Sequence, residues 1–441
     1  MIGKMPAPNS PIGFPPVPKT YTDAGLPLDL LRELVMKIVY KNNHSYGRDI
    51  ANELCLPWTG VVAPAVESLR AESLLDTTGT ASSQTDTDGD FKATLDYRLT
   101  GDGKIRVNEA LERCKYVGPA PVQLALYSTV TKHQGAQRTP VTRDMLFKAM
   151  GRLVLDPRIL DRLGAALTSR QSIFLYGPPG NGKSTIAVAC AELLGGPVFI
   201  PHAILVRNEI IRLFDPVYHR LVPGQLPSHD RRWNLCYRPM VAAGGEMKND
   251  DLELGFSEHN GFYEGSLQMK ANGGMLLIDD FGRQQVRPQE ILNRLIVPLE
   301  AGYDYVNIAR ASTTVQVPFT AILMLSTNIE PKQLVDEAFL RRVRYKIQIP
   351  NPTTEQYKVI MQRACADAKI PYTPDAVDRL IALHYNMKRP LHGCEPRDII
   401  EHLVSSATYM GKPPTLSNEL VDHAVDSYFA QMEMSNHPPG Q

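Results

Sequence analysis

Apolar residues follow two patterns along this chain, and each pattern predicts a different kind of structure. From Leu28 to about Cys114 they recur at helical spacing, interrupted by short strand-like segments. Further along, short unbroken apolar runs occur at Ile173–Tyr176, Met275–Ile278 and Ala321–Leu325. Runs of this length have the size of buried strands, so we expect an α/β core built on a parallel sheet.

The first 116 residues divide into an arm and a small domain. Residues 1–22 are rich in proline and glycine and lack periodicity, which predicts a flexible arm. Residues 23–116 predict three short helices, two strand-like segments around the polar stretch Thr77–Asp90, and a last helix that ends near Cys114. This layout, together with the turn Leu99-Thr100-Gly101-Asp102-Gly103, resembles a winged helix-turn-helix domain.

The charge of this domain argues against the DNA binding that such a layout suggests. Residues 1–116 hold 13 Lys and Arg against 15 Asp and Glu, a net charge of −2, whereas DNA readers present a basic face. The expected recognition helix carries Arg70 between Glu67 and Glu72. The expected wing holds three aspartates, Asp86, Asp88 and Asp90. We therefore favour a domain that docks on protein, with nucleic acid as the alternative partner.

Composition bounds the compartment. The 47 Lys and Arg balance the 47 Asp and Glu, so the whole chain has no general attraction to nucleic acid or anionic membranes. The six cysteines are scattered without metal-binding spacing, which favours reduced thiols. No apolar run has the length of a membrane span, and the N-terminus has no basic segment followed by an apolar core. We expect a cytoplasmic protein without membrane insertion.

One stretch carries specific chemistry. The strand Ile173–Tyr176 leads into Gly-Pro-Pro-Gly-Asn-Gly-Lys-Ser-Thr at 177–185 and then into a helix, which matches G-x-x-x-x-G-K-[ST] in its strand–loop–helix setting. In such a loop, backbone N–H groups surround phosphate oxygens, the lysine reaches the terminal phosphates and a hydroxyl binds Mg²⁺. We therefore expect ATP and Mg²⁺ as cofactors. The candidate nucleotide-binding residues are Gly177, Pro178, Pro179, Gly180, Asn181, Gly182, Lys183, Ser184 and Thr185.

Polar side chains end two of the predicted strands. Met275–Ile278 is followed by Asp279 and Asp280, and Ala321–Leu325 leads to Asn328. Ligands bind at the carboxyl ends of parallel strands, so these side chains should lie beside the phosphates. We expect Asp279 to hold Mg²⁺ and Asp280 to polarise the attacking water. The neutral amide of Asn328 suits hydrogen bonds to that water and to the γ-phosphate.

Arginines further along complete an ordered set. Arg341 and Arg342 end a predicted helix, and Arg397 lies near the start of another. In this order the motifs resemble those of AAA+ ATPases: Walker A, Walker B, sensor 1, arginine finger and sensor 2. The resemblance implies that Arg342, or alternatively Arg341, completes the site of a neighbouring subunit, and that Arg397 acts as sensor 2. The chain departs from the family at Asp280, where glutamate is usual, and this puts the hydrolysis rate in question.

The resemblance also assigns the segments around the acidic strand. Residues 201–272 predict an insertion with structure of its own. The segment 263–274 resembles the lead-in to Walker B in AAA+ proteins that carry an insert in the second helix, such as bacterial enhancer-binding activators and magnesium chelatases, and 303–317 predict a β-hairpin before sensor 1. In that clade both insertions project into the pore of a ring. There, Phe256, Phe262 and Tyr263 would grip an extended polypeptide or, equally, pack the insertion's own core.

These patterns give a complete domain plan and a function. The expected parts are a flexible arm (1–22), a winged-helix-like domain (23–116), a connector (117–154), an AAA+ α/β core (155–350) with Pro197–Ile200 as its second strand, a helical lid (351–435) and a tail (436–441). The hypothesis is a hexameric homo-oligomeric ATPase that remodels a protein client, similar to bacterial winged-helix AAA+ proteins labelled as ATPases with chaperone activity. Two alternatives stay open: a DNA-dependent motor or transcription regulator, and a nucleotide-gated assembly scaffold with slow turnover.

Overall fold

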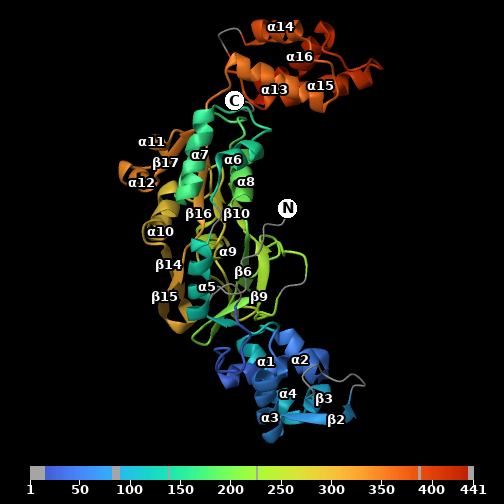
Figure 1. Ribbon diagram of the computed structural model, residues 1–441, viewed down its shortest axis with the longest axis vertical. Coiled ribbons are helices and arrows are strands. Elements are labelled where there is room, and N and C mark those ends of the chain that lie inside the picture. Colours follow the sequence, from blue (N-terminus) through green and yellow to red (C-terminus); the bar gives the residue numbers. More distant parts are fainter. Residues whose placement is uncertain (1–14, 82–89, 138–139, 225–226, 386–388, 436–441) are drawn as a thin grey trace, which may run out of the picture. The chain divides into compact units, whose positions relative to one another are not determined.

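The computed structural model describes residues 15–81, 90–137, 140–224, 227–385 and 389–435 (Figure 1). The chain divides into two compact units. The first consists of the described parts of 1–139 together with 194–276 and 285–323, and the second consists of 140–193, 277–284 and the described residues from 324 on. Most of the predicted arm (1–14) and the whole predicted tail (436–441) lie outside the described residues.

The N-terminal part of the first unit contains the helices and strands that the apolar pattern predicts. They are α1 (Leu28–Asn42), β1 (Ser45–Tyr46), α2 (Gly47–Leu54), a kinked turn (Trp58–Val62), α3 (Ala63–Ala71), β2 (Leu75–Ala81), a 3-10 turn (Phe91–Thr94), β3 (Leu95–Leu99) and α4 (Gly101–Arg113). The strands form an antiparallel sheet in the order β1-β3-β2. Leu31, Leu34 and Leu69 are fully buried in the core that these elements share. Burial of this apolar stripe is what stabilises the short helices.

Acidic side chains of this domain are engaged by the domain itself. The three described acids that argued against DNA binding have partners there: Glu72 with Arg32, Glu67 with Lys92, and Asp90 with the indole N–H of Trp58 at 3.0 Å. Asp86 and Asp88 of the predicted wing lie outside the described residues.

A second, five-stranded sheet takes four strands from the predicted insertion and one from the predicted connector. Its strands are β4 (Val122–Gln123), β7 (Ala203–Val206), β8 (Glu209–Arg212), β11 (Gly255–Ser257) and β12 (Phe262–Glu264), in the order β11-β12-β8-β7-β4. The accompanying helices are α5 (Leu124–Ala136), a 3-10 turn (Asn249–Leu252) and α9 (Leu267–Lys270). Phe262 is 7% and Tyr263 is 1% exposed, because both pack into apolar cores of the first unit. Phe262 and Tyr263 therefore pack the core of the first unit and are not available to grip a polypeptide.

The predicted hairpin is present and rests on the insertion. It consists of β14 (Tyr303–Ile308), a 3-10 turn (Ala309–Ala311) and β15 (Thr313–Pro318), and it follows α10 (Pro288–Ala301). Val306, Ile308 and Val317 are buried in the insertion's core. At the tip, the backbone N–H of Arg310 donates to the hydroxyl of Tyr263 at 3.0 Å. The hairpin is therefore docked along its length within the first unit.

The central sheet differs from the prediction in one of its strands. Its order is β10 (Met240–Ala243), β13 (Met275–Ile278), β16 (Ile322–Thr327), β5 (Ile173–Tyr176) and β17 (Tyr345–Gln348). The prediction that Pro197–Ile200 is a core strand was wrong, since β6 (Pro197–Pro201) pairs antiparallel with β9 (Trp233–Tyr237) in a separate ribbon. The sheet's edge is instead β10, from inside the predicted insertion. A short apolar run predicts burial but carries no information about which strand it will pair with.

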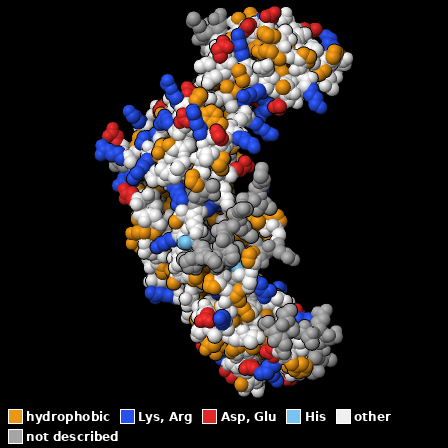
Figure 2. Space-filling view, viewed as in Figure 1, with side chains coloured by type: hydrophobic (Ala, Val, Ile, Leu, Met, Phe, Trp, Pro, Cys, Tyr) orange, Lys and Arg blue, Asp and Glu red, His pale blue; other side chains and the backbone are white. Residues whose placement is uncertain are grey.

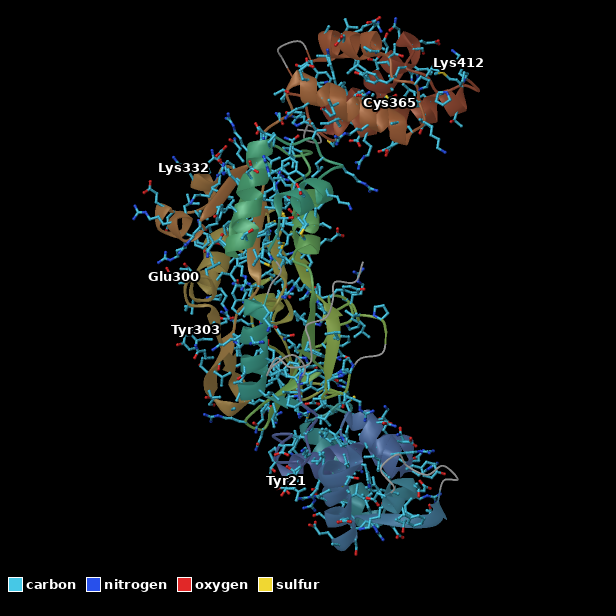
Figure 3. All side chains as sticks on the ribbon, in the orientation of Figure 1. Tyr21, Glu300, Tyr303, Lys332, Cys365 and Lys412 are labelled. Carbon is cyan, nitrogen blue, oxygen red and sulfur yellow. The ribbon has the colours of Figure 1, made fainter. Side chains whose placement is uncertain are left out.

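The second unit contributes the remaining helices. Those near the sheet are α6 (Arg143–Ala149), α7 (Pro157–Ser169), α8 (Lys183–Leu193), α11 (Pro331–Leu334) and α12 (Glu337–Arg342). The C-terminal bundle consists of α13 (Thr354–Asp367), α14 (Pro374–His384), α15 (Glu395–Tyr409) and α16 (Asn418–Ser435). It has its own apolar core, in which Cys365 is fully buried (Figure 3). Within the described ranges, no helix is both long enough and apolar enough to cross a membrane.

A buried ion pair fixes the N-terminal segment to the insertion. Arg232 and Asp230 are each 1% exposed, and their side chains meet at 2.7 Å. The Arg232 guanidinium also donates to the carbonyl oxygens of Ala24 at 2.8 Å and Pro121 at 3.0 Å. The backbone N–H of Asp230 donates to the carbonyl of Pro15 at 2.8 Å. Residues from 15 on, which were expected to belong to the flexible arm, are thus packed at this point.

Arg232→Ala should destabilise the first unit by about 3–5 kcal/mol, because it leaves the Asp230 carboxylate buried without a counter-ion. The measurement is the free energy of unfolding from denaturant titration of the full chain. Arg231→Ala is the matched control: this exposed neighbour bonds only to Asn52 among the described contacts, and its loss should cost no more than about 0.5 kcal/mol. Equal losses for the two variants would contradict the role of the buried pair.

The C-terminal bundle contains a buried carboxylate. Glu395 is 1% exposed, and one of its oxygens accepts hydrogen bonds from the Tyr385 hydroxyl at 2.8 Å and the His392 backbone N–H at 3.0 Å. Burial raises the pKa of Glu395, and these two hydrogen bonds, with the nearby charges of His392 and Arg389, only partly oppose the shift. The folded bundle therefore favours the protonated acid.

The bundle should lose stability as the pH rises from the ordinary glutamate pKa of 4.5 through the raised pKa of Glu395, because the unfolded chain ionises first. Glu395→Gln keeps the acceptor without the charge, so it should match the wild type below pH 4.5 and be more stable above it. Hydrogen-exchange protection of α15, corrected for intrinsic exchange rates, measures this. Glu401→Gln, on the exposed face of the same helix, should leave the pH dependence unchanged. A pH dependence that persists in Glu395→Gln would rule this explanation out.

Candidate active site

The glycine-rich loop (residues 177–185) joins β5 to α8 in the second unit. Gly177 has φ 139° and Gly180 has φ 75°, conformations that residues with a side chain rarely adopt. A Cβ at Gly177 would lie 2.2 Å from the carbonyl oxygen of Ile349, and one at Gly180 would lie 2.5 Å from the Cys394 sulfur. α8 begins at Lys183, so the positive end of its dipole faces the loop. Backbone and helix are both suited to an anion.

The register of the sheet decides which side chains meet this loop. β16 lies parallel to β5, with Thr327 level with Tyr176. The next residues, Asn328 and Gly177, therefore lie side by side just beyond the sheet. Lys183 is 7% exposed, and its ammonium donates to two loop carbonyls at 2.9 and 2.8 Å and to Asn328 Oδ1 at 2.6 Å. The predicted sensor 1 side chain thus contacts the predicted phosphate-binding lysine directly.

The two carboxylates join the same group of contacts. Asp279 Oδ2 accepts a hydrogen bond from Ser184 Oγ at 2.6 Å, and Asp280 Oδ1 accepts one from Asn328 Nδ2 at 3.2 Å. Burial lowers the pKa of Lys183, whereas Asp279 and Asp280 act in the opposite direction. The Asp280 backbone N–H donates to Asp279 Oδ1 at 3.0 Å, so hydrogen bonds link Lys183, Ser184, Asp279, Asp280 and Asn328 in one place, together with the carbonyls of Gly177 and Pro178.

The pair Ser184 and Asp279 fits a magnesium ion. Mg²⁺ prefers hard oxygen ligands and usually takes only one or two from protein, beside water and phosphate oxygens. A hydroxyl and a carboxylate oxygen 2.6 Å apart are such a donor set. Ser184 and Asp279 are therefore the residues that would hold the ion.

The turn after β13 is held tightly, by residues that sequence reasoning did not single out. Asp280 has φ 49°, which is uncommon for a residue with a side chain. The Phe281 backbone is fixed from both sides, since its N–H donates to Ser326 O at 2.7 Å and its carbonyl accepts from Thr327 Oγ1 at 2.6 Å. Gln284 closes the turn with two side-chain hydrogen bonds of 2.8 Å to the backbone. A glutamine in a loop and a threonine at a strand end have no spacing that could have revealed them.

The predicted arginines lie on helices of the second unit. Arg341 is 81% exposed and pairs with Glu337 on the same helix at 3.6 Å. Arg397 is 71% exposed and pairs with Asp398 at 3.1 Å and Glu401 at 3.7 Å, both on α15. Arg342 is half-buried at the end of α12. The described ion pairs of Arg341 and Arg397 are thus with carboxylates of their own helices, outside the group around Lys183.

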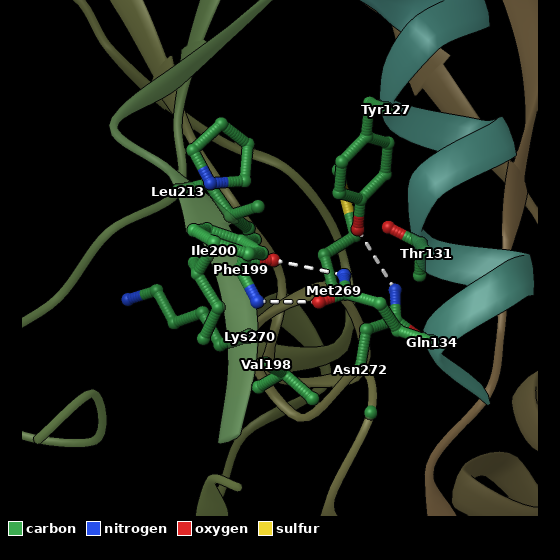
Figure 4. A pocket seen from close by; sticks show the side chains of 12 residues that line it. Tyr127, Thr131, Gln134, Val198, Phe199, Ile200, Leu213, Met269, Lys270 and Asn272 are labelled. Carbon is green, nitrogen blue, oxygen red and sulfur yellow. Dashed lines mark hydrogen bonds between the residues drawn. The ribbon is translucent and has the colours of Figure 1, made fainter. Parts of the chain in front are cut away.

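A separate small cavity lies in the first unit and is not a ligand site. It has a volume of about 10 Å³ and is lined by α5, β6 and the segment 269–273 (Figure 4). Its polar groups already have partners: the Gln134 side chain bonds both backbone groups of Phe199, and the Asn272 amide donates to the Tyr127 hydroxyl at 2.9 Å. Such a space holds at most one water molecule.

Comparisons with known proteins cover only parts of this chain. A family described as "Domain of unknown function (DUF8689)" matches residues 353–427, within the C-terminal bundle. No curated protein gives a match.

Solved structures match only distantly. NtrX from Brucella abortus in complex with ATP matches with a TM-score of 0.39 and 15% identity, over 65% of this chain and 60% of that one. The Thermotoga maritima RuvB Holliday junction branch migration motor matches with a TM-score of 0.35 and 14% identity, over 61% of this chain and 67% of that one. Similarity this low does not identify the chain's function.

Lys183→Ala should abolish ATP binding, because the variant loses the ammonium group that would bind the terminal phosphates beside Asn328. Isothermal titration calorimetry on the full chain measures this. Lys412→Ala serves as the control, since Lys412 is an exposed lysine of the C-terminal bundle whose ammonium pairs with Glu419 at 2.9 Å (Figure 3). Unchanged ATP affinity in Lys183→Ala would contradict the assignment of the site.

Proposed function

We propose that this protein is a Mg²⁺-dependent ATPase of the AAA+ type, which works as a homo-oligomeric ring and remodels a protein client. One observation carries the ATPase assignment: Lys183 contacts Asn328 in a group that also holds Ser184, Asp279 and Asp280. A loop lysine, a hydroxyl–carboxylate pair and a carboxylate–amide pair are the parts that phosphoryl transfer to water requires.

Each residue has a role that follows from its position. Lys183 donates here to three neutral oxygens, and phosphate oxygens would be stronger acceptors for its charge. Asp280, held by the Asn328 amide, would accept the proton of the attacking water while that amide orients it. Mg²⁺ at Ser184 and Asp279 would neutralise the negative charge of the phosphate oxygens.

The ring proposal rests on the surface around α12. On the face shown in Figure 2, Lys and Arg side chains gather over this part of the second unit. The exposed cations of α7, α11 and α12 and of the residues beside them are Arg158, Arg162, Arg170, Lys332, Arg341 and Arg344, and exposed acids lie among them at Asp156, Asp161, Glu330, Asp336 and Glu337. Because these charges nearly balance, the ring proposal depends on the arginines at the end of α12, whose guanidinium groups suit the phosphates of a nucleotide bound to a neighbouring subunit. We propose Arg342 at the end of α12 as the finger, with Arg341 as the alternative.

The client is best placed on the N-terminal domain. Phe262 and Tyr263 are buried and cannot grip an extended polypeptide without unpacking the insertion. The net charge of −2 over residues 1–116 suits a protein partner better than DNA. These observations support an adaptor or client that docks on residues 23–116, proposed as a winged helix.

The DNA-dependent alternative would use Arg310 at the hairpin tip. Its guanidinium lies 5.4 Å from the Phe256 ring centre and 3.7 Å from the Glu209 carboxylate. Contact with a DNA phosphate would have to replace these interactions. DNA-stimulated, salt-sensitive ATP hydrolysis would nevertheless favour this alternative.

Arg342→Ala should retain ATP binding and lose about 10³–10⁵-fold in turnover, the range in which arginine fingers act. Asp280→Asn should also bind ATP without turnover, because it lacks the base. Mixing the two inactive variants is the decisive measurement of phosphate release. A shared site would regain activity where an intact Asp280 meets an intact Arg342 across an interface.

The matched control is the same mixture with Arg341→Ala in place of Arg342→Ala. If Arg341→Ala is inactive alone and complements Asp280→Asn, the finger is Arg341. Failure of both mixtures to regain activity would contradict a site shared between subunits. ATP binding without phosphate release by the wild type would favour the scaffold alternative.

A further inference from the structure

Asn181 connects three parts of the second unit through one side chain. It lies in the glycine-rich loop and is 8% exposed. Its Nδ2 donates to the carbonyl of Pro350 at 3.2 Å and to Asn351 Oδ1 at 2.8 Å. Its Oδ1 accepts a hydrogen bond from the backbone N–H of Gly393 at 2.9 Å. The amide therefore uses both of its donor hydrogens and its acceptor on groups outside the loop.

The three partners belong to elements that follow the central sheet. Pro350 and Asn351 lie in the linker between β17 and α13, and Gly393 lies just before α15. The approach at this point is close, because a Cβ at Gly393 would lie 3.3 Å from the carbonyl oxygen of Gly180. Asn181 is thus hydrogen-bonded both to the linker that leads into the C-terminal bundle and to Gly393, which precedes α15 within it.

Within the bundle, further hydrogen bonds fix the residues next to Gly393. The residue before Gly393 is His392, whose backbone N–H donates to the buried carboxylate of Glu395 at 3.0 Å. That carboxylate accepts from Tyr385, whose hydroxyl is 3.0 Å from the hydroxyl of Tyr357 on α13. A chain of buried hydrogen bonds therefore extends from Asn181 into the bundle's core. Displacement of the Gly393 amide would disturb this chain.

We propose that Asn181 is the positioning residue that couples the state of the glycine-rich loop to the C-terminal bundle. This inference rests on the proposed function, because it assumes that a nucleotide occupies the loop. Phosphate bound by the loop's N–H groups would set the backbone position of Asn181. Since all three bonds run through one amide, a shift of this residue changes linker and bundle together. Asn181 acts on geometry and does not touch the reacting atoms.

Hydrogen exchange on the full chain tests the contact and the coupling separately. In the nucleotide-free protein, Asn181→Ala should raise the exchange rate of amides 391–400 by about tenfold, because it removes the acceptor of the Gly393 N–H. In the wild type, a non-hydrolysable ATP analogue should change exchange in both the loop and this segment. In Asn181→Ala the analogue should still protect the loop but leave 391–400 unchanged.

Two variants of Asn351 provide the matched controls. Asn351→Ala removes one acceptor of the Asn181 amide, whereas Asn351→Asp retains an oxygen at the same position. We expect the first to weaken the response of segment 391–400 to nucleotide and the second to preserve it. Turnover should fall further than ATP affinity in Asn181→Ala, since the binding groups of the loop remain.

The outcomes that overturn this proposal differ from those that overturn the proposed function. Unchanged exchange of 391–400 in nucleotide-free Asn181→Ala would show that the hydrogen bond between Asn181 and Gly393 does not stabilise this segment. An equal response of this segment to nucleotide in wild type and Asn181→Ala would show that the coupling runs elsewhere. Failure of the wild type to bind ATP would contradict the proposed function. The comparison of nucleotide-free wild type and Asn181→Ala would still decide whether the Asn181–Gly393 hydrogen bond stabilises segment 391–400.

Discussion

The position of β16 beside β5 is the constraint on which the whole site depends. Parallel pairing with Thr327 level with Tyr176 brings the end of one strand to the start of the glycine-rich loop. Only this register lets the Lys183 ammonium reach Asn328 at 2.6 Å, because a shift of one residue turns every side chain to the other face of the sheet. The contact between a loop cation and a strand-end amide is thus a consequence of backbone pairing.

β13, the strand that leads to Asp279 and Asp280, is held against β16 by hydrogen bonds at both of its ends. Before the two strands begin, the Asn272 side chain donates to Pro318 O at 2.9 Å and accepts from the Thr320 N–H at 2.8 Å. After they end, Phe281 is bonded to the backbone and hydroxyl of the last two residues of β16. These polar contacts explain how Asp280 keeps an uncommon backbone conformation.

Local patterns predicted which polar side chains would lie together, but they did not predict how distant segments of the chain pair. The strand–loop–helix motif and the polar strand ends each carry their signal within about ten residues, so Lys183, Asp279 and Asn328 could be found from the sequence. The pairing of Pro197–Pro201 with β9 depends on segments more than 30 residues apart, and an apolar run does not name its partner. The same holds for Asn181: its place in the loop was evident, but its partners lie about 170 and 212 residues away. Burial of Phe262 and Tyr263 likewise follows from long-range packing.

ATP turnover by the purified full chain, followed as phosphate release over a range of protein concentrations, tests the central claim most directly. The account predicts Mg²⁺-dependent hydrolysis that EDTA abolishes, with a rate per subunit that rises with protein concentration as subunits assemble around shared sites. Phosphate release that is insensitive to EDTA, or the absence of any release at concentrations where the chain is assembled and ATP is bound, would contradict it.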